Sequence, residues 1–146
     1  MPTRPGLVRT FRFRLTRGGL VFEERSPMAS LVVKITHAQD DPERAHLGCN
    51  VASVALASGL EVHVFLAAEG VHLARPAVPA GLEVAHAPPI GDLLDALYAA
   101  ATVTVCTPCM LRRDLDEGDF REGTRFAGSA QFVERATAEG ATAIVY

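Results

Sequence analysis

Short apolar runs rich in β-branched residues alternate with segments of helical periodicity along most of the chain, and this alternation constrains the fold more than any other feature. The apolar runs cover residues 31–36, 61–67, 102–105 and 141–146, with a shorter candidate at 82–84. Helical segments over 42–58, 90–100 and 129–139 separate them. Strands buried on both faces, as in parallel sheets, form continuous apolar runs. The pattern therefore predicts an α/β fold, a three-layer sandwich with a mostly parallel sheet and right-handed crossovers.

Capping residues indicate where two of these helices begin and end. Asp41 can cap a helix whose first residue is Pro42, and Gly59 can terminate it. The helix over 90–100 carries leucines on one face and is expected to be capped near Asp92. The chain thus encodes its helix boundaries locally.

Polar and glycine-containing segments between these elements are expected to be loops. One loop covers 68–71, directly after the second apolar run. Another covers 114–125, where charged residues and glycines predominate. Both follow apolar runs that end in the core, so they are expected to lie at the surface.

Residues 1–27 differ in composition from residues 28–146. The first segment carries a net charge of +4 and the second a net charge of −7. Phe11, Phe13 and Leu15 alternate with polar residues, so a β-hairpin is conceivable there. The favoured interpretation is that residues 1–27 are an extension outside the core fold and that residues 28–146 form one domain.

The charge and composition of the domain exclude some functions and favour a compartment. An acidic domain argues against nucleic acid as a partner, because phosphate binding needs clustered cations. Membrane insertion is not expected, because no apolar run approaches the roughly 20 residues that a transmembrane helix needs. Three cysteines without a disulfide framework fit a reducing cytoplasm. We therefore expect a cytoplasmic globular protein.

A cysteine at the end of the third long apolar run is the candidate for chemistry. Cys106 follows this run directly, and parallel α/β sheets place their sites at the carboxyl ends of strands. The N–H groups of the following turn and the guanidinium of Arg112 or Arg113 could lower its pKa. His37, after the first strand, could also tune the thiol. We predict that Cys106 is partly thiolate at neutral pH; the alternative is a buried, inert cysteine.

Two other chemistries are open at the same turn. Cys106 and Cys109 match the C-x-x-C pattern of thiol–disulfide oxidoreductases, although no Trp precedes them. Zinc would need two further ligands, and Cys49, His37 and His46 would serve only if the fold gathered them. The sequence holds neither a second C-x-x-C nor a spaced His pair, so no metal is expected.

The run Cys106-Thr-Pro-Cys-Met-Leu-Arg112-Arg113 resembles the cysteine motif of the DsrE/DsrF-like family, the small YchN-fold proteins of sulfur relay. The resemblance extends over about 31–146 and includes the Asp-Pro turn, the Ala-rich helix ending at Gly59 and the loop Glu69-Gly-Val. Cys109 is a departure from the family pattern, because it is an extra thiol beside the carrier cysteine.

The resemblance implies a sulfur carrier of the sulfurtransferase type. Cys106 would accept sulfane sulfur as a persulfide from a donor protein and pass it to an acceptor protein. Arg112, or else Arg113, would stabilise the persulfide anion. A homo-oligomer is expected, a trimer or hexamer, with a dimer as the fallback, and no cofactor. The alternatives are a redox protein using Cys106 and Cys109, and a non-catalytic binding subunit of the same fold.

Overall fold

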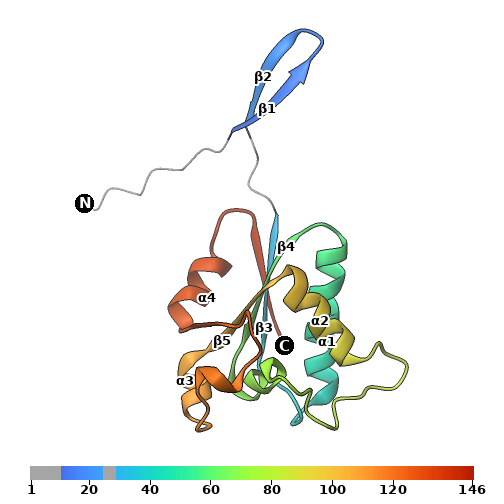
Figure 1. Cartoon of the computed structure of the whole chain (residues 1–146), viewed down its shortest axis with the longest axis vertical. Helices are drawn as coiled ribbons and strands as arrows, with labels where there is room; N and C mark the ends of the chain where they lie inside the picture. The colour runs from blue at the N-terminus through green and yellow to red at the C-terminus, as the bar shows by residue number, and fades with distance from the viewer. Residues whose placement is uncertain (1–10, 25–28) are drawn as a thin grey trace, which may run out of the picture.

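The domain is built on a five-stranded parallel sheet with the strand order β6-β5-β4-β3-β7. The computed structural model describes residues 11–24 and 29–146. The strands, shown in Figure 1, are β3 (Ser30–Ile35), β4 (Glu61–Leu66), β5 (Thr102–Cys106), β6 (Arg125–Ala127) and β7 (Ala141–Val145). From β3, the first strand of the domain, the chain adds β4, β5 and β6 in turn on one side. The last strand, β7, pairs with the other side of β3, which therefore lies between β4 and β7.

Helices cover both faces of the sheet, which confirms the predicted three-layer α/β architecture. Helices α1 (Pro42–Ala57) and α2 (Ile90–Ala100) lie together on one face (Figure 1). Helix α4 (Ser129–Ala136) lies on the other face, and the five-residue α3 (Thr107–Leu111) follows β5 directly. We call these the α1/α2 face and the α4 face.

The capping predictions were right for one helix and wrong for the other. Asp41 is the N-cap of α1, its carboxylate accepts the Arg44 N–H at 3.1 Å, and Pro42 is the first helical residue. Helix α2 instead has Pro89 at its N-cap with no side-chain cap, and Asp92 lies inside the first turn. There the carboxylate faces the positive end of the helix dipole without capping it.

Three predictions about connecting segments were wrong. Residues 82–84 form no strand; Leu82 is fully buried and anchors the long connection to the core. The loop expected at 68–71 is the start of a 3₁₀ helix, η1 (Ala68–Ala74). The loop expected over 114–125 holds the 3₁₀ helix η2 (Glu117–Asp119), and the edge strand β6 begins at its last residue. A local capping box between Asp116 and Asp119 holds η2, whereas β6 is held by its pairing with β5.

Alternate residues of each strand point to opposite faces of the sheet. On β5, Thr102 and Thr104 line a pocket with residues of α4, so Cys106, two residues further on, also belongs to the α4 face. Val103 and Val105 therefore face α1 and α2, where they are buried. One strand thus supplies apolar groups to one layer and polar groups to the other.

Two glycines allow close approach of elements to β3. A Cβ at Gly70 of η1 would overlap the backbone carbonyl of Ile35, and a Cβ at Gly48 of α1 would lie 2.7 Å from Ile35 Cγ1. Since Ile35 is fully buried, neither neighbour has much room to move. These contacts fix η1 and α1 at the carboxyl end of β3.

The last strand is joined to the first strand of the domain beyond their shared ladder. Tyr146 donates its N–H to the Lys34 carbonyl at 2.8 Å, and its own carbonyl accepts the Thr36 N–H at 2.9 Å. The Thr36 hydroxyl donates to the same carbonyl at 2.7 Å. Residues 30–36 and 141–146 therefore form one continuous parallel pair.

A β-hairpin precedes the domain, which was the less favoured of the two interpretations of this segment. Strands β1 (Phe11–Thr16) and β2 (Gly19–Glu24) pair antiparallel and form a separate two-stranded sheet. Residues 1–10 and 25–28 lie outside the described residues, so the assignment of 1–27 as an extension stays a prediction. Within the described residues, no helix combines the length and apolarity needed to cross a bilayer.

Candidate active site around Cys106

Cys106 is the last residue of β5 and the N-cap of α3, as its position after an apolar run predicted. Its side chain is nearly buried, with 6% of the residue exposed. Cys106 makes no side-chain capping hydrogen bond, but the backbone N–H of Cys109 is near enough to lower the pKa of its thiol, and the Cys109 thiol raises that pKa. The C-x-x-C spacing thus brings the two sulfur groups together within the first turn of α3.

The prediction that Cys106 is partly thiolate at neutral pH is wrong for this structure. Burial raises the pKa of the Cys106 thiol above its ordinary value, and the adjacent Cys109 thiol acts in the same direction. The Cys109 N–H and the Lys34 ammonium lower the pKa but do not outweigh burial. A five-residue helix offers few N–H groups, and desolvation is the larger effect.

Lys34 is the functional candidate that sequence reasoning missed. It lies on the α4 face of β3, and its Nζ sits 4.8 Å from the centre of the Phe132 ring. It is the cation whose field lowers the Cys106 pKa. A signal existed in the sequence, because Lys34 is the charged residue within the otherwise apolar run 31–36.

The two arginines after Cys109 lie in different surroundings, and their predicted role toward a persulfide on Cys106 stays a prediction. Arg112 is exposed at the C-cap of α3, the end of the helix opposite to Cys106. Arg113 points back: its Nη1 donates to the Cys109 carbonyl at 2.9 Å, and its Nε and Nη2 donate to Glu69 at 3.1 and 2.5 Å. Its charge is therefore partly neutralised by Glu69, and its contacts connect α3 to η1.

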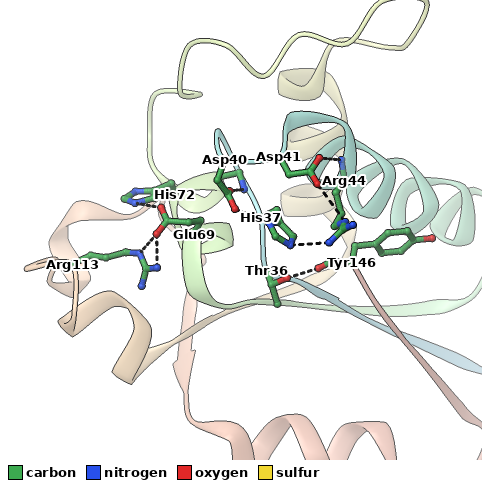
Figure 2. A network of polar contacts seen from close by, with 10 residues as sticks. Thr36, His37, Asp40, Asp41, Arg44, Glu69, His72, Arg113 and Tyr146 are labelled. Carbon is green, nitrogen blue, oxygen red and sulfur yellow. Dashed lines mark hydrogen bonds and ion pairs between the residues drawn. The ribbon is translucent and has the colours of Figure 1, made fainter.

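Glu69 links α3 to η1. Besides Arg113, its carboxylate lies 3.5 Å from Nε2 of His72 (Figure 2). Gly70, the next residue, packs on the backbone of Ile35. The turn that carries the thiols is thus tied through Arg113 and Glu69 to the carboxyl end of β3.

His37 belongs to a separate polar cluster at the carboxyl end of β3 (Figure 2). Arg44 Nη1 donates to its Nε2 at 3.2 Å, so the ring proton is on Nδ1 and is donated to Asp40 Oδ2 at 2.6 Å. Burial opposes ionisation of Asp40, but hydrogen bonds from the Ala38 N–H and His37 hold its pKa below the usual value. Both ring nitrogens are occupied, and tuning of Cys106 by His37 stays a prediction.

The residues considered for zinc are not gathered around Cys106. Cys49 is fully buried in α1, on the opposite side of the sheet, and burial raises its pKa to about 12. His46 is buried too, and its Nε2 donates to the Pro88 carbonyl at 2.7 Å. Across the described residues, no three His, Cys, Asp or Glu side chains are arranged to hold a metal ion.

Sequence comparisons place this chain among known proteins. A model of the DsrE/DsrF-like family matches residues 29–145. The uncharacterized protein MJ0989 of Methanocaldococcus jannaschii is 37% identical over 100 residues, which are 65% of this chain and 81% of that protein. The uncharacterized protein MK0008 of Methanopyrus kandleri is 35% identical over 98 residues, 66% of this chain and 78% of that protein.

Solved structures share the fold. MTH1491 from Methanobacterium thermoautotrophicum, a protein of unknown function, superposes with a TM-score of 0.62 at 21% identity, over 80% of this chain and 98% of that one. The ychN protein of E. coli gives a TM-score of 0.61 at 17% identity, over 80% of this chain and all of that one. At these identities the likeness concerns the fold alone, and it confirms the YchN-like prediction.

Proposed function

The chain belongs to the DsrE/DsrF-like family, and on that premise we propose that it is a sulfur-relay protein that carries sulfane sulfur as a persulfide on Cys106. The observation that carries the proposal is the setting of Cys106. It ends β5, and the Cys109 N–H and the Lys34 ammonium both act to lower the pKa of its thiol. A sulfur atom with a nearby donor and cation can hold negative charge during transfer.

The transfer is an exchange at sulfur. The Cys106 thiolate attacks the outer sulfur of a donor persulfide; the Cys106 S–S bond forms as the donor S–S bond breaks, and the electron pair leaves on the donor thiolate. That thiolate takes up the proton lost by Cys106, so a thiol and a persulfide become a persulfide and a thiol. A thiolate of the acceptor protein then attacks the outer sulfur of the Cys106 persulfide, and Cys106 returns to a thiol.

The raised pKa of Cys106 suits a carrier that must wait for its donor. A protonated thiol resists oxidation, because the thiolate is the reactive form. Binding of a donor would bring its own polar groups to the site and ease loss of the proton. We therefore expect loading to depend on the partner more than on the free thiol.

A thiol–disulfide redox function is the second candidate, because the Cys109 thiol contacts Cys106. Attack of the Cys109 sulfur on a loaded Cys106 would form the Cys106–Cys109 disulfide and release hydrogen sulfide, with atoms and electrons balanced. A two-cysteine redox protein would use this disulfide as its working state. A non-catalytic binding subunit would use neither thiol.

Intact-mass measurement after incubation with a persulfide donor tests these functions. The carrier predicts a gain of sulfur-atom increments by wild type, Cys109→Ser and Cys49→Ser, and no gain by Cys106→Ser. Cys49→Ser is the matched control, because it removes a buried thiol on the other face. Loss of two hydrogens that disappears in Cys109→Ser would favour the redox protein. No mass change in any variant would refute both.

The assembly and the compartment form part of the same proposal. We infer a homo-oligomer, a trimer or hexamer with a dimer as the fallback, which exchanges sulfur with donor and acceptor proteins in a reducing cytoplasm. The free cysteines Cys49, Cys106 and Cys109 fit such a compartment. Native mass spectrometry measures the assembly, and a monomer at micromolar concentration would contradict it.

A further inference from the structure

A hollow lies on the α4 face of the sheet, where Thr104, two residues before Cys106, is one of its lining residues. It is a shallow hollow between the sheet and α4, open to solvent on one side. Val32 and Phe65 form its apolar floor, and Phe132 of α4 covers it, with the two phenyl rings 5.5 Å apart. Cys106 is not among its lining residues. The hollow therefore adjoins the thiol turn without including the Cys106 sulfur.

Two arginines from different elements line this hollow. Arg125 comes from β6 and Arg135 from the last turn of α4. Within the part of the chain that the structure describes, neither has a carboxylate partner. Four other described arginines do have one: Arg44, Arg75, Arg113 and Arg121. Two unpaired guanidinium groups at one small hollow favour an anion as its ligand.

The inner polar groups of the hollow donate and accept hydrogen bonds without adding charge. His63 is 8% exposed, and its Nε2 lies 3.0 Å from the Glu61 carboxylate. Burial, and then the field of Arg135, lower the pKa of His63, so the ring is neutral at physiological pH. Thr102, Thr104 and Gln131 add hydroxyl and amide groups. Positive charge comes from the two arginines and from Lys34, whose Nζ lies 4.8 Å from the centre of the Phe132 ring.

We propose that this hollow binds a small organic acid. Its carboxylate lies between the Arg125 and Arg135 guanidinium groups, whose planar forks suit carboxylate oxygens. Its apolar body lies against the rings of Phe65 and Phe132. The hollow is shallow and open, so it suits a small ligand that stays partly exposed to solvent. The apolar floor favours an organic acid over an inorganic anion.

The test uses benzoate as the probe and the full chain as the protein. Titration calorimetry and chemical-shift mapping should show saturable binding of benzoate, with shifts at the residues of the hollow. Benzamide, which has the same shape without the charge, should bind at least about tenfold more weakly. Arg125→Gln and Arg135→Gln should each weaken benzoate binding by about tenfold. Arg17→Gln, an equal loss of charge at an exposed hairpin position, should leave it unchanged.

Several results would overturn the proposal. These are absence of saturable benzoate binding, equal binding of benzamide, insensitivity to both arginine substitutions, or tighter binding of inorganic phosphate than of benzoate. A change of native mass in the arginine variants without benzoate binding would assign the arginines to contacts between copies instead. Cys106→Ser should still bind benzoate, so failure of the sulfur-carrier proposal would leave this inference intact.

Discussion

The two faces of the sheet use neighbouring residues of the same strands for different purposes. On the α1/α2 face, helices of 16 and 11 residues cover side chains such as Val103 and Val105, which are buried. On the α4 face, a helix of eight residues covers Thr102, Thr104 and Cys106 together with Lys34 and His63. The two longer helices cover apolar side chains, whereas the shorter helix packs over a face that holds buried polar and reactive groups.

The cysteines show what this difference teaches. Cys49 and Cys106 are both buried, and burial raises the pKa of both thiols. Desolvation is the cause of the raised pKa of Cys49. At Cys106 the Cys109 N–H and the Lys34 ammonium act against desolvation and lower the pKa. The residue type is the same, and the layer in which each thiol lies decides which groups oppose its desolvation.

Truncating one side chain in each helical layer tests most directly whether the two layers differ in their contribution to stability. Leu97→Ala on α2 should lower the free energy of unfolding by about 2–5 kcal/mol, because Leu97 is 1% exposed and truncation leaves a cavity. Val133→Ala on α4 should change it by no more than about 0.5 kcal/mol, because Val133 is 54% exposed. Urea denaturation followed by circular dichroism measures both. Similar losses would show that the two layers contribute equally to stability.

Gly70 tests the contact where η1 meets the end of β3. Gly70→Ala should cost about 2–3 kcal/mol of unfolding free energy, because the new Cβ overlaps the Ile35 carbonyl and the backbone must move. The matched control is Gly91→Ala in α2, where the nearest atom is Val78 Cγ2 at 3.6 Å and helix propensity favours alanine. Equal urea midpoints for the two variants would contradict this close approach.

The pH dependence of stability sharpens the contrast between the cysteines. The pKa of Cys49 rises from 9.0 to about 12 on folding, so its contribution is fully present below pH 9 and is lost between pH 9 and 12. Over that range, wild type should lose about 1.4 kcal/mol per pH unit relative to Cys49→Ala. Urea titrations at several alkaline pH values measure the slope. Parallel curves for the two proteins would contradict burial of this thiol.

Substitution of Lys34 gives the smallest expected effect and tests the polar character of the α4 face. Lys34→Met should slow alkylation of Cys106 by iodoacetamide by a factor of about two to five, because loss of the cation raises the thiol pKa further. Lys34→Arg keeps the charge and should retain the rate. Peptide mass spectrometry locates the alkylated cysteine. A faster reaction in Lys34→Met would show that Lys34 shields the thiol instead of activating it.

Features that depend on residues close together in the sequence were predictable from it. The Asp41 cap, the Pro42 start of α1 and the strand ending in Cys106 all rest on local chemistry and periodicity, and all are present. The strand β6 was missed because three residues, Arg125–Ala127, carry no periodicity of their own and are held by pairing with β5. A short strand whose formation depends on pairing with another strand is therefore hard to predict from its own sequence.

The electrostatics of the site could not be deduced in the same way. The Cys106 pKa moves opposite to the prediction, because the number of donors in α3 can be read from sequence whereas the depth of burial cannot. Arg113 follows Arg112 directly, yet it turns back to Glu69, a residue 44 positions earlier. Which of two adjacent cations serves the thiol turn is decided by the position of η1, which is a tertiary property.

The pairing of β7 with β3 has a consequence for biosynthesis. Thr36 and Tyr146 are 110 positions apart, and a ribosome makes the earlier strand first. Until residues 141–146 emerge, β3 presents an unpaired edge of N–H and C=O groups to other nascent chains. Parallel pairing over such a separation is also slow to form. The interval between synthesis of the first and last strands is therefore when this protein is most exposed to misassembly and most in need of a chaperone.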